Sequence, residues 1–190
     1  MMFSGDNDRE LVDILMRCWC PEFRLYDKKN KYRDQYQAWA KAGYMETTPE
    51  EAIDYNYVRA RVVEDNKYFK IDSISVDRFY KGFEFATKLD KEIGGTENSP
   101  KIIACGLGFA SMAGLTQEFE RRMINLKLNH GGNPILRWMV DNVAVDMDPA
   151  GSLKPNKSKS QGKIDGVIGM LLALNQLMRM PERRSVWMPS

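Results

Sequence analysis

A long apolar segment near the C-terminus constrains the fold more than any other feature of the sequence. Residues 165–180, DGVIGMLLALNQLMRM, predict a helix that is apolar on nearly every side. Such a helix must lie inside a domain, with other elements packed around it. No apolar stretch reaches the roughly 18–20 residues that span a bilayer, so we expect no membrane-spanning segment and no membrane partner.

A carboxylate, that of Asp165, stands immediately before this apolar run. One interpretation is a helix cap, because an aspartate near a helix N-terminus accepts hydrogen bonds from unpaired backbone N–H groups and complements the positive end of the dipole. The other is a functional site at the mouth of a buried helix. The residue alone does not decide between them.

Composition predicts a globular domain without a strong preference for a charged partner. The 190 residues make one domain that can bury a core, and 43% hydrophobic with 28% charged residues excludes a disordered chain. The net charge of +2 means that any nucleic-acid surface must be a local patch. The N-terminal MMFSGDNDRE becomes polar too early for a signal peptide, and Cys18, Cys20 and Cys105 suit reduced thiols in a cytosolic compartment.

The inventory of catalytic side chains excludes several chemistries. His130 is the only histidine, so HExxH and multi-histidine zinc sites are impossible, and a serine triad would need that one residue without any nucleophile-elbow motif. The glycines of GLGFAS (106–111) are not followed by a Lys-Ser/Thr pair, so this segment is not a phosphate loop. Carboxylates remain abundant, and they suit hard cations such as Mg²⁺ and Mn²⁺.

Predicted strands and helices alternate along the chain, which favours an α/β domain with a partly parallel sheet. The expected strands are residues 9–20, 69–77 and 101–108, and the first of these could also be helical. A hairpin with DPAG as its turn is expected at 142–155. The expected helices are 21–37, one from about Asp54, 78–93 ending at Gly94-Gly95, 112–128, and the final apolar helix.

Two aspartates stand at the ends of apolar-rich elements, where Asp77 leaves a strand and Asp165 enters a helix. In α/β sheets, ligand sites collect where strands end and helices begin. Two carboxylates brought together there repel each other unless a cation bridges them, which is the arrangement of two-metal nucleases. Spacing alone does not establish that they meet, so a shared metal site is one interpretation and two unrelated acids, at a strand end and a helix cap, are the other.

Several short motifs follow one another along most of the chain. The C-terminal ones are HGGNP (130–134), the RWM…NV stretch (137–143), which we expect to be a strand, DPAGSLKP (148–155) and KIDG (163–166). Upstream are WAKAGYMETTPEEAIDYNYV (39–58), ISVDRF (74–79) and GFASM (108–112). Each motif is weak alone, but in this order they resemble the large subunit of tailed-phage terminases.

The resemblance implies that residues 1–180 are a terminase nuclease domain with a ribonuclease H-like fold, a mixed central sheet flanked by helices, and that residues 181–190 form a tail. In that family the domain cuts concatemeric double-stranded viral DNA during genome packaging, and three acidic residues hold divalent metal ions. By position Asp77 resembles the second family acid and Asp165 the third. The implied cofactors at these residues are Mg²⁺ or Mn²⁺, as two ions.

The resemblance also implies partners and a location. Besides double-stranded DNA, the expected partners are the terminase ATPase domain, the small terminase subunit and the portal. The expected location is the cytoplasm of the host cell, with a phage or prophage as the source of the gene.

Departures from the family pattern leave an alternative open. The first family acid lies on a strand that would precede Met1, and the ATPase motor domain is absent too, so we expect weak cutting or none from this chain itself. The segment DRFYKGFEF (77–85) is also bulkier and more basic than the pattern. The alternative is a catalytically incomplete module that binds DNA or docks onto the motor or portal. A recombinase or junction resolvase of the same fold matches the motif order less well.

The remaining candidate residues each have a structural and a functional interpretation. Asp148 lies in the DPAG turn, where aspartate is favoured for turn geometry, and it could alternatively bind metal. His130 could order its loop or act as a general base. Four lysines beside Asp165 form either a solvated loop or a flap that contacts DNA phosphates, with Lys163 nearest to the proposed site: Lys154, Lys157, Lys159 and Lys163.

Overall fold

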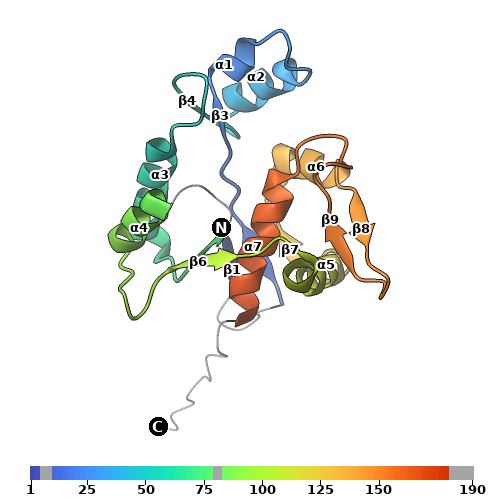
Figure 1. Cartoon of the computed structure of the whole chain (residues 1–190). Helices are drawn as coiled ribbons and strands as arrows, with labels where there is room; N and C mark the ends of the chain where they lie inside the picture. The colour runs from blue at the N-terminus through green and yellow to red at the C-terminus, as the bar shows by residue number, and fades with distance from the viewer. Residues whose placement is uncertain (5–9, 79–82, 180–190) are drawn as a thin grey trace, which may run out of the picture.

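The computed structural model describes residues 1–4, 10–78 and 83–179 (Figure 1). Its helices are α1 (Phe23–Tyr26), α2 (Arg33–Lys41), α3 (Tyr55–Phe69), α4 (Phe83–Glu92), α5 (Phe109–Ile124), α6 (Pro134–Asp141) and α7 (Asp165–Arg179). Its strands are β1 (Met2–Ser4), β2 (Val12–Ile14), β3 (Trp19–Pro21), β4 (Glu46–Thr48), β5 (Ile74–Asp77), β6 (Ile102–Cys105), β7 (Leu128–Asn129), β8 (Val145–Met147) and β9 (Leu153–Pro155).

The chain is an α/β protein, and the expectation of partly parallel strands is confirmed. Strands β2 and β7, β3 and β4, and β5 and β6 pair in parallel, whereas β1 pairs with β2, and β8 with β9, in antiparallel fashion. The described strands do not join into the single central sheet that we expected. They form a three-stranded sheet in the order β1-β2-β7 and three separate pairs.

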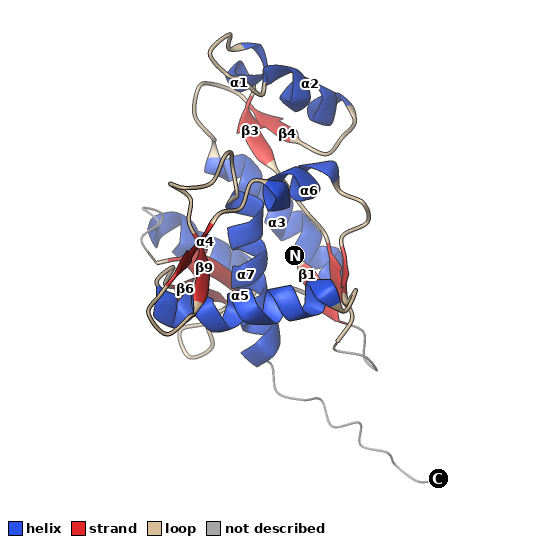
Figure 2. Ribbon diagram, turned by 90° about the vertical axis from the view of Figure 1, so that its right-hand side faces the viewer, coloured by secondary structure: helices blue, strands red, loops and turns tan. Residues whose placement is uncertain are grey.

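The apolar helix α7 occupies the centre of the molecule, as its sequence predicted. Its buried apolar residues are Val167, Ile168, Met170, Leu171, Leu172 and Leu174. The helix packs against α5, α6, β5 and β1, and Figure 2 shows α5 and α6 crossing it. A helix with so small a polar face is stable in water only when most of its surface is covered in this way.

Several local predictions are confirmed together with their physical causes. Helix α3 begins directly after Asp54, whose carboxylate caps it by accepting a hydrogen bond of 2.8 Å from the N–H of Asn56. Strand β5 ends at Asp77, and β8 and β9 form the hairpin around the DPAG turn. The expected helix at 78–93 corresponds to α4, which ends at Glu92, although its first residues, 79–82, lie outside the described residues.

Two secondary-structure predictions are wrong. The RWM…NV stretch, expected as a strand, belongs largely to helix α6. Asn133 caps this helix by accepting a hydrogen bond of 3.0 Å from the N–H of Leu136, and Pro134 occupies its first turn. The expected helix 21–37 is two helices, α1 and α2, because the carboxylate of Asp27 accepts a hydrogen bond from the N–H of Lys29 and turns the chain between them.

Two expected boundaries also shift. Residues 9–20 contain two short strands, β2 and β3, rather than one. Helix α5 ends at Ile124, before the expected end at 128, because Leu126 adopts a positive φ of 55° that a helix cannot continue through. The expected tail, residues 181–190, lies outside the described residues.

Candidate functional site

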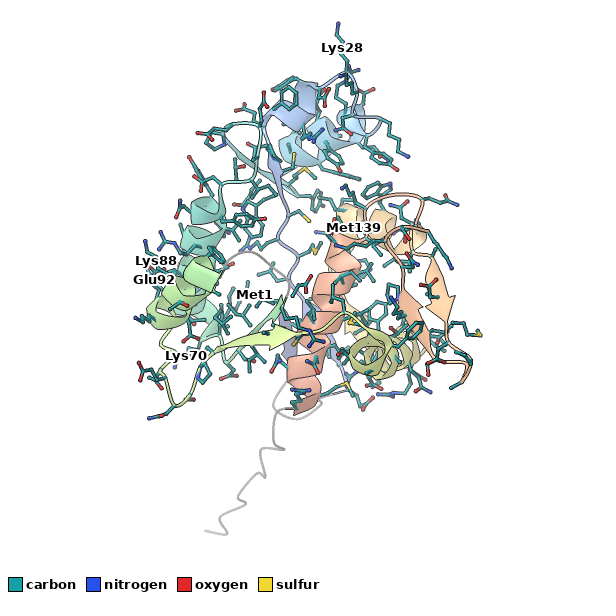
Figure 3. All side chains as sticks on the ribbon, viewed as in Figure 1. Met1, Lys28, Lys70, Lys88, Glu92 and Met139 are labelled. Atoms are coloured by element: carbon teal, nitrogen blue, oxygen red, sulfur yellow. The ribbon has the colours of Figure 1, made fainter. Side chains whose placement is uncertain are left out.

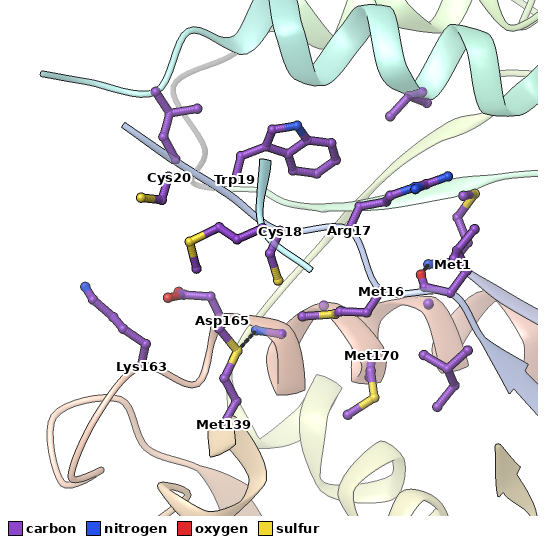
Figure 4. Close-up of a pocket in the computed structure, with 18 of the residues that line it drawn as sticks. Met1, Met16, Arg17, Cys18, Trp19, Cys20, Met139, Lys163, Asp165 and Met170 are labelled. Atoms are coloured by element: carbon purple, nitrogen blue, oxygen red, sulfur yellow. Dashed lines mark hydrogen bonds between the residues drawn. The ribbon is translucent and has the colours of Figure 1, made fainter. Parts of the chain in front are cut away.

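A cavity of about 1090 Å³ lies between two strand edges, with α7 along one side. Residues of β1 and of the 14–21 segment line it on one side, and residues 71–75, which lead into β5, line it on the other. The first turn of α7 stands at its mouth, and Figure 4 shows Asp165 there beside Cys18, Met16 and Met139. In this cavity Asp165 meets residues from segments that are distant in the sequence.

The carboxylate of Asp165 is exposed and is held by a lysine. Its side chain is 58% exposed, and its Oδ1 accepts a hydrogen bond of 2.6 Å from Nζ of Lys157. Within the described residues no backbone N–H donates to this carboxylate, so the capping interpretation is not supported by a hydrogen bond. The acid still stands in the first turn of α7, where the helix dipole favours a negative charge.

Gly166, the last residue of the KIDG motif, allows two methionines to approach the start of α7. Its N–H lies 3.1 Å from Sδ of Met139, as the dashed line in Figure 4 shows. A Cβ added at this position would lie 2.3 Å from Cε of Met16 and 2.8 Å from Sδ of Met139. The glycine therefore fixes how closely the 14–21 segment and α6 approach the carboxylate that precedes it.

The charge of Asp165 is felt by two weakly acidic groups in the cavity wall. Burial, and to a lesser extent the Asp165 carboxylate, raises the pKa of the Cys18 thiol to about 12. Burial, followed by several weaker interactions that include Asp165, also raises the pKa of Tyr36 to about 12. These two groups report the electrostatic state of the cavity mouth.

Asp77, the other predicted ligand, does not line this cavity. It pairs in register with Cys105 of β6, and Sγ of Cys105 accepts a hydrogen bond of 3.3 Å from Nδ2 of Asn175. Asn175 lies ten residues beyond Asp165, about 15 Å farther along α7 at 1.5 Å per residue. Asp77 thus lies in a strand pair that contacts α7 near Asn175, whereas Asp165 stands in the first turn of that helix.

Other acids of the cavity were missed by the sequence analysis. Asp65 is buried and forms ion pairs with Arg17, at 2.9 Å, and with Arg61, at 3.5 Å. This pairing compensates its charge, so it suits a structural role. Asp72 is exposed and lines the same cavity as Asp165. Neither Asp65 nor Asp72 belongs to a recognisable motif. Their position in the cavity depends on packing between segments that are distant in the sequence.

Asp165 offers a single exposed carboxylate to a magnesium-type ion. Among the described residues, no three histidine, cysteine, aspartate or glutamate side chains are arranged to hold a metal. Mg²⁺, however, commonly binds through one or two carboxylates, with water and substrate phosphates completing its shell. The ammonium group of Lys157 already stands 2.6 Å from Oδ1 of Asp165, so this carboxylate binds a cation in the place where a metal would bind.

The four predicted lysines differ in their contacts. Lys157 pairs with Asp165, and Lys159 pairs with Asp146 at 2.6 Å; the Lys159 hydrogen bond is the main cause of a lowered Asp146 pKa. Lys154 stands over the ring of Phe109, with 5.1 Å between its Nζ and the ring centre. Lys163 is exposed and lines the cavity with Asp165.

The two remaining candidates have local contacts that account for them. The carboxylate of Asp148 accepts hydrogen bonds from the N–H groups of Ala150 and Ser152, at 3.0 and 2.8 Å, as a turn-forming aspartate does. His130 accepts a backbone hydrogen bond from Asn133 and so shapes the loop before α6. Its Nδ1 is buried without a hydrogen-bond partner among the described residues, and His130 does not line the cavity.

Comparisons with known proteins agree with one another. The model of the family "terminase large subunit, endonuclease domain" matches residues 21–182. The large terminase subunit of Enterobacteria phage HK97 is 28% identical over 174 residues, which cover 92% of this chain and 34% of that protein. Protein YmfN of Escherichia coli strain K12 is 25% identical over 179 residues, which cover 91% of this chain and 38% of that protein.

A solved structure extends the likeness to three dimensions. The crystal structure of the HK97 large terminase matches with a TM-score of 0.77 and 29% identity, over 92% of this chain and 36% of that one. The chain thus spans about a third of the length of the relatives that it matches. In the described part of the chain, no helix has the length and apolar character needed to cross a bilayer.

Proposed function

Because the chain belongs to the family of terminase large subunit endonuclease domains, we propose that it is a metal-dependent endonuclease domain that cuts concatemeric double-stranded viral DNA during genome packaging. The observation that carries this proposal is the exposed carboxylate of Asp165, which stands at the mouth of a large cavity beside Lys157 and Lys163. An accessible anion for a metal and cations for phosphates are the two requirements of phosphodiester hydrolysis. The proposed fold is ribonuclease H-like.

In this proposal Asp165 is the principal metal ligand, for Mg²⁺ or Mn²⁺. Two bound ions would supply an activated water and stabilise the leaving oxygen. The chain's own contribution is to hold the carboxylate at the exposed start of α7, where Gly166 lets Met16 and Met139 pack behind it. Lys163, Lys157, Lys159 and Lys154 would bind the DNA backbone, without reading its sequence.

The proposed role of Asp77 is that of a second metal ligand. As a second ligand to the same ions it would have to approach Asp165, and its strand pair contacts α7 near Asn175, ten residues farther along the helix. We therefore keep Asp77 as a candidate ligand whose substitution tests the proposal separately. Asp148 and His130 are not assigned a catalytic role, since local turn and loop contacts account for them.

The alternative function does not require the two acids to meet. A catalytically incomplete module that binds DNA, or docks onto the motor domain or portal, needs the lysines but no shared metal site. We propose the nuclease first because the matched family is that of the endonuclease domain. Residues 1–180 are the proposed domain and 181–190 the proposed tail, working with the ATPase domain, the small terminase subunit and the portal in the host cytoplasm.

The proposal is tested by Asp165→Asn, which keeps the shape of the side chain and removes its charge. Plasmid nicking and calorimetric Mn²⁺ binding are compared for the parent chain, this variant, Asp77→Asn, and the control Asp141→Asn on the exposed end of α6. We expect Mn²⁺ binding and any nicking to be lost in Asp165→Asn and kept in the control. A folded Asp165→Asn variant that binds Mn²⁺ as the parent does would refute the proposal.

A further inference from the structure

Two loops that lie far apart in the sequence meet at the mouth of the cavity. One is the 27–32 turn between α1 and α2, and the other is the 156–164 loop between β9 and α7. The hydroxyl of Tyr32 donates a hydrogen bond of 3.1 Å to the carbonyl of Gln161. A Cβ at Gly162 would lie 2.9 Å from the same hydroxyl, so the glycine is needed for this close contact.

Aromatic packing fixes the 27–32 turn in this place. The ring of Tyr32 meets the ring of Trp138 edge-on, with 4.8 Å between the ring centres. Trp39 of α2 also packs against Trp138 of α6, at 5.3 Å. Such pairs stabilise a junction beyond the area that they bury, so the turn is held against α6 and is not a freely moving surface loop.

The turn brings lysines to the cavity that the sequence analysis did not single out. Lys29 and Lys31 are exposed and line the cavity together with Lys163 and Asp165. Nζ of Lys31 lies 3.5 Å from the carbonyl of Gln161 and 4.7 Å from the ring centre of Tyr32. In the described ranges, no carboxylate forms an ion pair with Lys29, Lys31 or Lys163, whereas Lys157 and Lys159 each have one.

We propose that Lys29, Lys31 and Lys163 form a phosphate-binding surface for the backbone of duplex DNA. This inference rests on the proposed function and assigns its substrate-binding surface. Cations without a carboxylate partner attract phosphates without first losing an ion pair, and successive phosphates of one strand are spaced closely enough to meet several of them. The duplex is thereby held across the mouth, with a phosphate near Asp165.

The same turn supplies a matched control. Lys28 is exposed, but it does not line the cavity, and Figure 3 shows it at the outer tip of the molecule, pointing away from Met139. Lys41, at the end of α2, is exposed and does not line the cavity either. Replacing Lys28 and Lys41 removes the same charge from the same part of the chain as replacing Lys29 and Lys31.

The test measures binding of a fluorescent duplex to the 190-residue chain by anisotropy, in EDTA, between 50 and 200 mM salt. In Lys29→Ala/Lys31→Ala the slope of log affinity against log salt should fall by about 1.8, since each phosphate contact contributes about 0.9. Raising the salt from 50 to 200 mM should then weaken DNA binding by the variant about tenfold less than it weakens DNA binding by the parent chain. Lys28→Ala/Lys41→Ala should keep the parent slope.

If Lys29→Ala/Lys31→Ala does not fold, a second variant takes its place. Lys29→Ala/Lys163→Ala keeps the contact of Lys31 with Gln161, and its slope should fall by the same amount. An unchanged slope, a fall equal to that of the control, or no DNA binding by the parent chain would overturn the proposed surface. EDTA removes cutting from the measurement. A parent chain that binds DNA through these lysines, but whose Mn²⁺ binding is unchanged in Asp165→Asn, would instead contradict the nuclease proposal alone.

Discussion

Nζ of Lys157 lies 2.6 Å from Oδ1 of Asp165, and both side chains are more than half exposed. The lysine therefore holds the carboxylate in the absence of a divalent ion and competes with any ion that binds there. Because the pair is exposed, it contributes only about 0.2–1 kcal/mol, and a metal with a double charge can displace the lysine.

The first prediction concerns this competition. Lys157→Met should increase the affinity for Mn²⁺ by up to about fivefold, because the variant removes the competing cation and its repulsion. Calorimetric titration with Mn²⁺ measures the effect. Lys159→Met is the control, since Lys159 pairs with Asp146 and not with Asp165. Equal affinities in the parent and in Lys157→Met would mean that no ion binds at this carboxylate.

The second prediction uses Cys18 as a reporter of Asp165. The negative charge of Asp165 helps to raise the pKa of this thiol, although burial is the larger cause. Asp165→Asn should therefore lower the pKa of Cys18 while leaving it above its ordinary value. Mass spectrometry of alkylation at Cys18 between pH 8 and 10 measures the change. Alkylation at the parent rate would show that the two groups do not interact.

The third prediction concerns stability at alkaline pH. The pKa of Cys18 is raised to about 12 in the folded chain, so the unfolded chain releases this proton first, near pH 8.5. The thiol's contribution to the free energy of unfolding is thus fully present below pH 8.5 and is lost as the pH rises toward 12. We expect the free energy of unfolding, measured by urea unfolding at several pH values, to decline with rising pH more slowly in Cys18→Ala than in the parent chain. The two slopes should differ by up to about 1.4 kcal/mol per pH unit. Parallel declines would contradict the burial of this thiol.

The fourth prediction compares two glycines of α7. Gly166→Ala should reduce the free energy of unfolding by about 1–3 kcal/mol, because the new Cβ would overlap Met16 and Met139. A Cβ at Gly169 meets nothing within 4 Å, so Gly169→Ala should be neutral or stabilise the helix by up to about 1 kcal/mol. Urea titration measures the free energy of unfolding of both variants. Equal values for the two variants would contradict the prediction.

Elements with a strong local pattern were predictable from the sequence. The apolar helix α7, the cap of α3 at Asp54 and the β8–β9 hairpin all follow from periodicity, capping or turn residues within a few positions. Helix α6 was predicted wrongly, as a strand in the resemblance, although Asn133-Pro134 is a local helix-start signal.

The arrangement of the site could not be predicted in the same way. The distance between Asp77 and Asp165 depends on how β5 and β6 dock onto α7, which involves residues about a hundred positions apart. The lysines of the 27–32 turn likewise reach the cavity only through the contact between Tyr32 and the 156–164 loop. Such contacts leave no periodic signal in the sequence.

Side-chain hydrogen bonds join α7 to the β5–β6 pair near the far end of the helix. Nε2 of Gln176 donates to Oγ of Ser75 at 2.8 Å, and Nδ2 of Asn175 donates to Sγ of Cys105. Apolar contact has no direction of its own, so the shape of the packed side chains and these directional amide contacts together set where the helix lies along the strands. The position of the KIDG carboxylate thus depends also on polar contacts three turns away, at the opposite end of the helix.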